Sequence, residues 1–238
     1  MAFSVLALAL AAGCGGDGKS ADPSPAPTRE DALLCGRRAG GAETISYLDS
    51  TGERIRGALV GRGRVGFLFA HAFREDLCSW LPFARHVADG GDAALTFTFP
   101  GGVPDADDVA AGVTQLRRHG ARDVVLVGAS MGAAASLVAA NRVHPLVRGV
   151  VSVSSPLRYS GLDAIDAARR LRVPVVYTAG RDDGHFAAYA RRLFLTTHED
   201  TKRLVILDDF AHGTDLLGGP EGDRLASVTV GLGQQHGG

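Results

Sequence analysis

The chain has 238 residues, of which 45% are hydrophobic and 21% are charged. That length fits one large domain with additional termini, and the composition is that of a globular protein that can bury a core. Twenty-five Lys and Arg residues face 26 Asp and Glu residues, for a net charge of −1. This balance excludes a nucleic-acid-binding protein that relies on a strongly basic surface, and it excludes an acidic disordered chain.

The N-terminus has the pattern of an export signal. The apolar run Val5–Ala12 has eight residues, whereas a membrane-spanning helix needs about 20. Such a run followed by small residues is typical of a secretory signal, here residues 1–13. Ala11–Cys14 resembles a bacterial lipobox, which implies that Cys14 is acylated and begins the mature protein. The match departs from the pattern in having Ala11 instead of Leu and no Lys or Arg before the run.

The next segment, residues 14–42, is predicted to be a flexible tether. Its first half alternates Pro with small residues and has no apolar period, so burial cannot offset the entropy of ordering it. We therefore expect a protein outside the cytoplasm, lipid-anchored to the cell membrane or secreted. An ordinary secretory signal, or a soluble chain with an apolar start, is the alternative. After export Cys35 and Cys78 form an even pair, either bridged or as free thiols.

The remaining residues, 43–238, alternate predicted strands and helices. Glu43–Leu48 and Arg54–Val60 flank the turn residues Asp49–Gly52 and so predict a hairpin. Six short apolar runs follow, and they are typical of strands buried on both faces of a parallel sheet: Val65–Ala70, Ala94–Phe99, Val124–Gly128, Gly149–Val153, Val173–Thr178 and Leu204–Leu207.

Segments with a helical period separate these runs. In Asp105–Gly120 the apolar residues recur at i, i+4 and i+7, with Asp residues in the first turn and Arg residues in the last. His185–Thr197 repeats the pattern. The alternation predicts an α/β fold with about eight mostly parallel strands and helices on both faces of the sheet.

A candidate nucleophile lies in Gly128–Gly132, whose sequence is G-x-S-x-G with Ser130 at the centre. The motif follows a predicted strand and opens into Ala133–Asn141, a predicted helix. A sharp turn in this context lifts the serine hydroxyl above the edge of the sheet. The helix N-terminus beneath it supplies backbone N–H groups where an oxyanion would form. A Gly-rich turn with an incidental serine is the alternative.

With this motif the sequence resembles the α/β-hydrolase family, over roughly residues 43–232. The resemblance implies a Ser-acid-His order along the chain. It places the acid at Asp183, in a turn similar to the family's G-x-x-D, and the base at His212, after the last predicted strand. Asp182, one position earlier, and Asp209 are the alternative acids. In such a triad the acid orients the imidazole, and His212 takes the proton of Ser130.

The resemblance also implies an oxyanion hole. Residues 69–73 are similar to the family's His-Gly-x loop, with Ala72 in the glycine position. The match makes the backbone N–H groups of Phe73 and Met131 the oxyanion donors. His71 in this loop is expected to form structural hydrogen bonds.

The resemblance implies a serine esterase without a cofactor, and no Cys/His cluster in the sequence suggests a metal site. The family often carries a lid domain, but the connection from Val153 to Gly161 is too short for one. We therefore expect an open site for small or polymeric esters, with contact to a membrane only through the anchor. Thioester or peptide cleavage and cofactor-free perhydrolysis stay open, as does a surface binding protein without turnover. Serine at the elbow disfavours a dehalogenase or a dienelactone hydrolase.

The anchor can be tested by replacing the candidate lipidation residue. When expressed in a bacterium, the wild type should partition with membranes and gain the mass of acyl chains, whereas Cys14→Ser should remain soluble and unmodified. Membrane fractionation with intact-mass measurement distinguishes the two outcomes. Equal release of both proteins into the soluble fraction would contradict the lipobox assignment.

Overall fold

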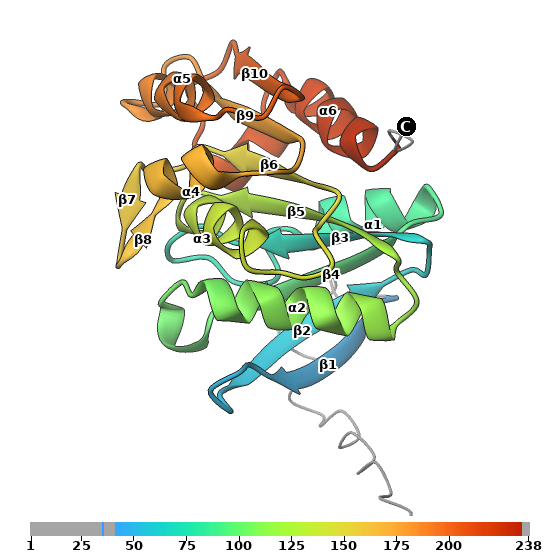
Figure 1. Ribbon diagram of the computed structural model, residues 1–238. Coiled ribbons are helices and arrows are strands. Elements are labelled where there is room, and N and C mark those ends of the chain that lie inside the picture. Colours follow the sequence, from blue (N-terminus) through green and yellow to red (C-terminus); the bar gives the residue numbers. More distant parts are fainter. Residues whose placement is uncertain (1–34, 36–40, 235–238) are drawn as a thin grey trace, which may run out of the picture.

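The computed structural model describes Cys35 and residues 41–234, which include an eight-stranded sheet with helices on both faces (Figure 1). The strands lie in the order β1-β2-β4-β3-β5-β6-β9-β10. Their bounds are β1 Glu43–Leu48, β2 Arg54–Val60, β3 Val65–Ala70, β4 Ala93–Thr98, β5 Asp123–Ala129, β6 Gly149–Val153, β9 Val175–Gly180 and β10 Lys202–Leu207. The prediction of about eight mostly parallel strands is confirmed.

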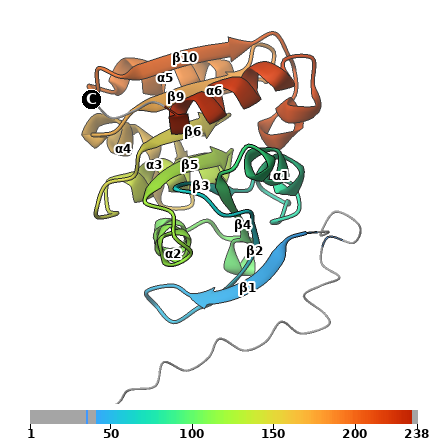
Figure 2. The ribbon, with the colours of Figure 1, turned by 90° about the vertical axis from the view of Figure 1, so that its right-hand side faces the viewer.

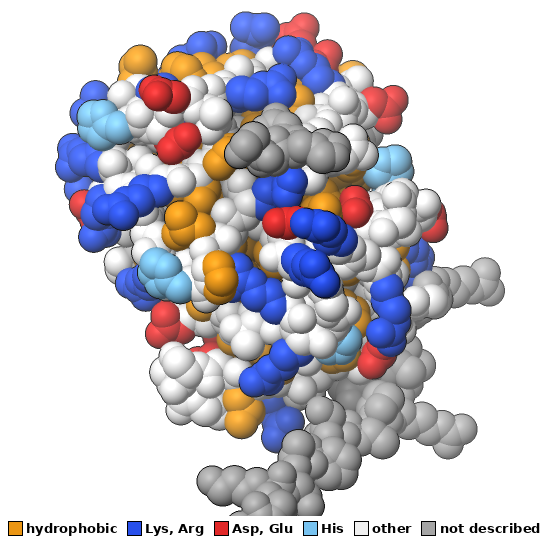
Figure 3. All heavy atoms as spheres, turned by 45° about the vertical axis from the view of Figure 1, so that its right-hand side comes forward, with side chains coloured by type: hydrophobic (Ala, Val, Ile, Leu, Met, Phe, Trp, Pro, Cys, Tyr) orange, Lys and Arg blue, Asp and Glu red, His pale blue; other side chains and the backbone are white. Residues whose placement is uncertain are grey.

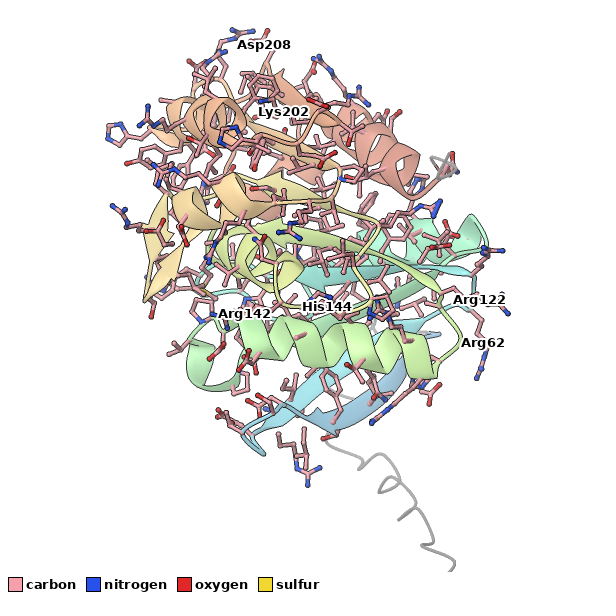
Figure 4. All side chains as sticks on the ribbon, in the orientation of Figure 1. Arg62, Arg122, Arg142, His144, Lys202 and Asp208 are labelled. Carbon is pink, nitrogen blue, oxygen red and sulfur yellow. A yellow bond between two sulfur atoms is a disulfide. The ribbon has the colours of Figure 1, made fainter. Side chains whose placement is uncertain are left out.

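The direction of the strands determines where loops can meet. β1 pairs antiparallel with β2, with Glu43 opposite Leu59, and β2 pairs antiparallel with β4. All other neighbouring pairs in this sheet are parallel. Their carboxyl ends therefore share one edge, while Arg62 and Arg122, which precede β3 and β5, mark the opposite one (Figure 4). In open α/β sheets, ligands bind at the carboxyl edge.

The helices divide between the two faces of the sheet. α2, α3, α4 and α5 cover one face, and α1 and α6 cover the other (Figure 2). Their bounds are α1 Leu81–Asp89, α2 Ala106–Arg118, α3 Met131–Ala140, α4 Ala164–Arg170, α5 Phe186–Thr196 and α6 Gly222–Gln234, with the 3-10 turns η3 Pro100–Gly102 and η4 Gly213–Gly218. Each layer buries its own hydrophobic core against the sheet, which is why the central strands are apolar on both faces.

Several boundaries differ from the prediction. β9 begins two residues later than predicted and runs on to Gly180. Pro174 stands before it; proline has no N–H for a strand ladder, but its carbonyl accepts a hydrogen bond of 2.9 Å from the N–H of Val150. The sequence analysis did not predict α1, α4 or α6, and α1 and α4 are short, with nine and seven residues.

The connection after β6 is as short as predicted. It contains two strands of two residues each, β7 Arg158–Tyr159 and β8 Leu162–Asp163, which pair with each other and lead directly into α4. Between β6 and β9 the structure therefore has no inserted domain, and no cap of this kind covers the carboxyl edge of the sheet.

A disulfide joins Cys35 to Cys78, with the two Cα atoms 5.5 Å apart. Cys78 lies in the segment between β3 and α1, so the bond fastens Cys35 to the segment that follows β3. It closes a loop with a sequence separation of 43 residues. In the chain-entropy account such a closure stabilises the fold by roughly 3–4 kcal/mol. Over the described part of the chain, no helix has both the length and the apolar character needed to cross a membrane.

One buried carboxyl group makes stability depend on pH. Asp105 directly precedes α2, and its side chain caps the helix by accepting the N–H of Asp107. Asp108 in the same turn is buried. Burial raises its pKa to about 7, helped by the negative charges of Asp105, Asp49, Glu53 and Asp107. A helix N-terminus normally favours an anion, but desolvation outweighs that effect here.

We expect Asp108→Asn to stabilise the protein above pH 7. The pKa of the Asp108 carboxyl group is higher in the folded state than in the unfolded state. The contribution of this group to the free energy of unfolding is therefore fully present below pH 4, and it is lost as the pH rises through about 7. The variant should exceed the wild type in unfolding free energy by roughly 1–4 kcal/mol at pH 8 and lose that advantage near pH 4. Urea unfolding at both pH values measures the difference, and an equal difference at both would contradict the account.

Candidate active site

Ser130 lies in a strained turn between β5 and α3. Its φ is 49° and its ψ is −116°, a backbone conformation that non-glycine residues rarely adopt. The N–H of Ser130 donates to the carbonyl of Val153 at the end of β6, at 2.8 Å. The turn therefore stands at the carboxyl edge of the sheet, and the serine is only partly buried there.

The two glycines of the motif permit this turn to pack closely. A Cβ atom on Gly128 would lie 2.3 Å from the carbonyl oxygen of Gly132, and one on Gly132 would lie 2.4 Å from the carbonyl oxygen of Ala70. Real Cβ atoms essentially never come so close to backbone. The first contact seats the start of α3 on β5, and the second brings it against the end of β3. Larger residues at either position would push the serine turn away from the neighbouring loop.

The structure brings two of the candidate site residues into direct contact. Nδ1 of His212 lies 3.0 Å from both carboxyl oxygens of Asp183. A carboxylate accepts hydrogen bonds, so Nδ1 carries the proton and Nε2 is left as an acceptor. The Asp183 side chain is 8% exposed and the His212 side chain 36%, which leaves the imidazole accessible while its partner is shielded.

Further contacts fix this pair, including one that the sequence analysis missed. The hydroxyl of Ser154 donates to Oδ2 of Asp183 at 2.7 Å and accepts the N–H of Gly213 at 3.3 Å. The ring of Phe186 packs against the imidazole of His212, with centroids 4.3 Å apart. Ser154 directly follows β6, which is the signal that could have placed it at this edge.

The two alternative acids lie elsewhere. Asp182 is exposed, and its N–H donates to the carbonyl of Asp209 at 3.1 Å. Asp209 is buried, but its carboxyl group accepts the N–H of Ala211 at 2.9 Å. Of the three carboxyl groups, only that of Asp183 is within hydrogen-bonding distance of His212.

The backbone groups assigned to the oxyanion hole belong to adjacent segments. Met131 is the first residue of α3, whose initial N–H groups have no partner within the helix. Phe73 lies in a turn that the N–H of Glu75 closes on the carbonyl of Ala72 at 3.3 Å, with Arg74 in the left-handed region at φ 64°. The side chain of Phe73 is 59% exposed, so its contribution to the site would be its backbone.

His71 holds the start of that turn and is buried. Its Nε2 accepts the N–H of Phe99 at 3.0 Å, so Nδ1 carries the proton and donates to the carbonyl of Ala72 at 2.7 Å. Burial lowers the pKa of His71, which favours this neutral form. The side chain therefore has the structural role that was expected of it.

A groove of about 600 Å³ flanks this edge of the sheet on the side of α1 and α6. Its lining mixes apolar and polar side chains and includes Ser79, Phe83, His86, Thr214, Asp215 and Asp223. Thr214 is two residues beyond His212 in the chain, but none of Ser130, Asp183 and His212 lines this groove. No cluster of three or more His, Cys, Asp or Glu side chains suited to a metal ion occurs among the residues that the structure describes. Cys14 lies outside those residues.

No family model matches the sequence, and no curated protein matches it. Solved structures do resemble the fold. The esterase domain of a Rhodothermus marinus protein is 22% identical, covers 81% of this chain and 96% of its own, and has a TM-score of 0.65. An esterase from Pyrococcus furiosus is 14% identical with a TM-score of 0.70, over 82% and 93% of the two chains.

A dienelactone hydrolase from Anabaena variabilis is also similar, at 23% identity and a TM-score of 0.61, over 82% of this chain and 96% of that one. These likenesses and the strand order show that the chain has the α/β-hydrolase fold. The family resemblance predicted from the sequence is confirmed at the level of the fold.

The identity of the acid can be tested with two adjacent residues. Asp183→Asn should leave the fold intact and lower kcat by about 10⁴-fold, as the equivalent change does in a serine protease, because the amide favours the wrong tautomer of His212. The matched control Asp182→Asn should change kcat little, since its side chain is exposed. Steady-state hydrolysis of one p-nitrophenyl ester at pH 7.5 provides the comparison. Loss of activity in the control alone would contradict the assignment.

Proposed function

We propose that the protein is a serine hydrolase that cleaves carboxylic esters through an acyl-enzyme. The single observation that carries the proposal is the contact of His212 with the shielded carboxyl group of Asp183 at the sheet edge where the strained Ser130 turn stands. Nucleophilic catalysis requires a hydroxyl, a base with a free acceptor nitrogen and a group that orients the base. The names of two solved structures with the same fold, both esterases, support ester cleavage.

In the proposed mechanism Oγ of Ser130 attacks the ester carbonyl carbon while Nε2 of His212 removes the serine proton. Asp183 stabilises the imidazolium that forms. The backbone N–H groups of Phe73 and Met131 stabilise the oxyanion. His212 then donates the proton to the departing alcohol and later takes one from the water that hydrolyses the acyl-enzyme. The cycle is complete with groups of this chain and water, so it requires no cofactor.

The surroundings of the site suit an accessible ester. The connection after β6 has no room for a cap, and both Ser130 and His212 are only partly buried. A small ester or an ester group on a polymer could therefore reach Ser130. Basic and acidic side chains both occur on the face seen in Figure 3, which gives no support to a nucleic-acid partner.

We also propose that the protein works outside the cytoplasm, as a lipid-anchored or secreted enzyme. The proposal rests on the signal-like residues 1–13, on the lipobox-like Cys14 and on the tether over residues 14–42. The disulfide between Cys35 and Cys78 supports it, because such bonds persist mainly in oxidising compartments.

Ser130→Ala should abolish ester hydrolysis without unfolding the protein. Removal of a triad nucleophile lowers kcat by about 10⁶-fold in a serine protease, while a partly exposed hydroxyl contributes little to stability. A matched control is Ser160→Ala, since Ser160 is another serine with positive φ, at 45°, but is exposed in the β7–β8 turn. Most activity retained in purified Ser130→Ala would refute the proposal, and loss of activity in both variants would point to backbone strain.

A further inference from the structure

Glu75 contacts both loops of the proposed site. Its Oε2 accepts the backbone N–H of Ala72 at 3.0 Å, and its Oε1 accepts the hydroxyl of Thr214. Ala72 directly precedes Phe73, the proposed oxyanion donor, and Thr214 is two residues after His212, the proposed base. The two bonded residues Glu75 and Thr214 are 139 positions apart in the sequence.

These contacts are made where the two loops already approach each other. A Cβ atom added to Gly213 would lie 3.5 Å from the Cβ atoms of both Ala72 and Ala129, which is ordinary van der Waals distance. Thr214 is buried and Glu75 is half-buried. The carboxyl group therefore lies within a packed junction, where hydrogen bonds hold groups in place more firmly than they do at an exposed surface.

The oxyanion turn needs an external support. Residues 72–75 contain one backbone hydrogen bond, from Glu75 to Ala72, and a left-handed Arg74, a conformation that costs energy for a residue other than glycine. By accepting the N–H of Ala72, the carboxyl group of Glu75 fixes the orientation of the His71–Ala72 peptide, which directly precedes the peptide that carries the N–H of Phe73. The second carboxyl oxygen, Oε1, accepts the hydroxyl of Thr214 and so connects this peptide to the loop that follows His212.

We propose that Glu75 is a positioning residue that clamps the oxyanion loop to the loop of the base. It holds the backbone N–H of Phe73 and the imidazole of His212 in a fixed relation, so that both face the same carbonyl group in the transition state. The inference rests on the proposed function. It adds to the triad a residue that touches no reacting atom.

The clamp predicts a particular kinetic effect. An oxyanion donor acts mainly in the transition state, so its displacement should lower kcat and leave KM nearly unchanged. Displacements of about 1 Å in a catalytic arrangement cost on the order of 10²-fold in rate. Glu75→Ala removes both bonds and should lower kcat by about 10–100-fold. Thr214→Val removes one bond and should lower kcat by a smaller factor.

The variant Glu75→Gln distinguishes the effect of the two hydrogen bonds of Glu75 from the effect of its negative charge. The amide retains an oxygen that can accept the N–H of Ala72 and gains an N–H that can donate to the hydroxyl of Thr214. If Glu75 acts as a bridge, this variant should keep kcat within about threefold of the wild type. Asp76→Asn is the matched control, because Asp76 is the adjacent acidic residue and its carboxyl group accepts the N–H of Cys78 in its own loop; it should leave kcat unchanged.

The test measures kcat and KM of the wild type and these four variants on one p-nitrophenyl ester, with the folding of each checked by circular dichroism and thermal unfolding. A folded Glu75→Ala with wild-type kcat overturns the clamp, and so does a Glu75→Gln as impaired as Glu75→Ala. An increase in KM alone overturns it as well. If instead the wild type hydrolyses no ester, the proposed function fails first. If Glu75→Ala does not fold, the kcat values of Thr214→Val and Glu75→Gln still test the clamp.

Discussion

The close approach of backbone around Ser130 is the constraint on which the rest of the site depends. The carbonyl oxygens of Gly132 and Ala70 occupy the positions where side chains at Gly128 and Gly132 would have to fit. This contact lets α3 start directly above the ends of β3 and β5, so the turn can hold Ser130 at a positive φ. The serine, the first N–H groups of α3 and the loop after β3 are consequently brought to one place at the sheet edge.

The remaining parts of the site reach that edge from distant parts of the chain and are fastened there by polar contacts. Ser154 connects the carboxyl group of Asp183 to the backbone of Gly213, and so relates the acid to the loop of the base. On the other side, His71 and the disulfide of Cys78 hold the segment between β3 and α1. The site gains precision from such contacts, because no domain inserted between β6 and β9 presses the loops together.

Local sequence patterns were sufficient for the strands and for the elbow. The apolar runs of the parallel strands and the glycines around Ser130 are short-range signals; the runs indicated the strands and the glycines indicated the sharp turn, whereas the order of the strands in the sheet was not predicted. The resemblance of residues 180–183 to the family's G-x-x-D turn also favoured Asp183 over Asp182, and the structure pairs Asp183 with His212. Helices α1 and α4 were not predicted, because nine and seven residues give too little periodicity to stand out.

Contacts between residues that are far apart along the chain could not be predicted from the sequence. The bond from Thr214 to Glu75 and the bond from Ser154 to Asp183 depend on how loops from different strands are folded over the edge. The burial of Asp108 is of the same kind: the sequence shows a helix start rich in acidic residues, and only the packing of α2 reveals that one of them is inside.

The most direct test of the account is covalent labelling by an active-site-directed organophosphonate, followed by peptide mass spectrometry of the wild type and of His212→Ala. The account predicts one equivalent of phosphonate on Ser130 of the wild type within minutes, and labelling slowed by orders of magnitude in His212→Ala, since the base activates the hydroxyl. An unlabelled Ser130 in the folded wild type, or a label on another residue, would contradict it.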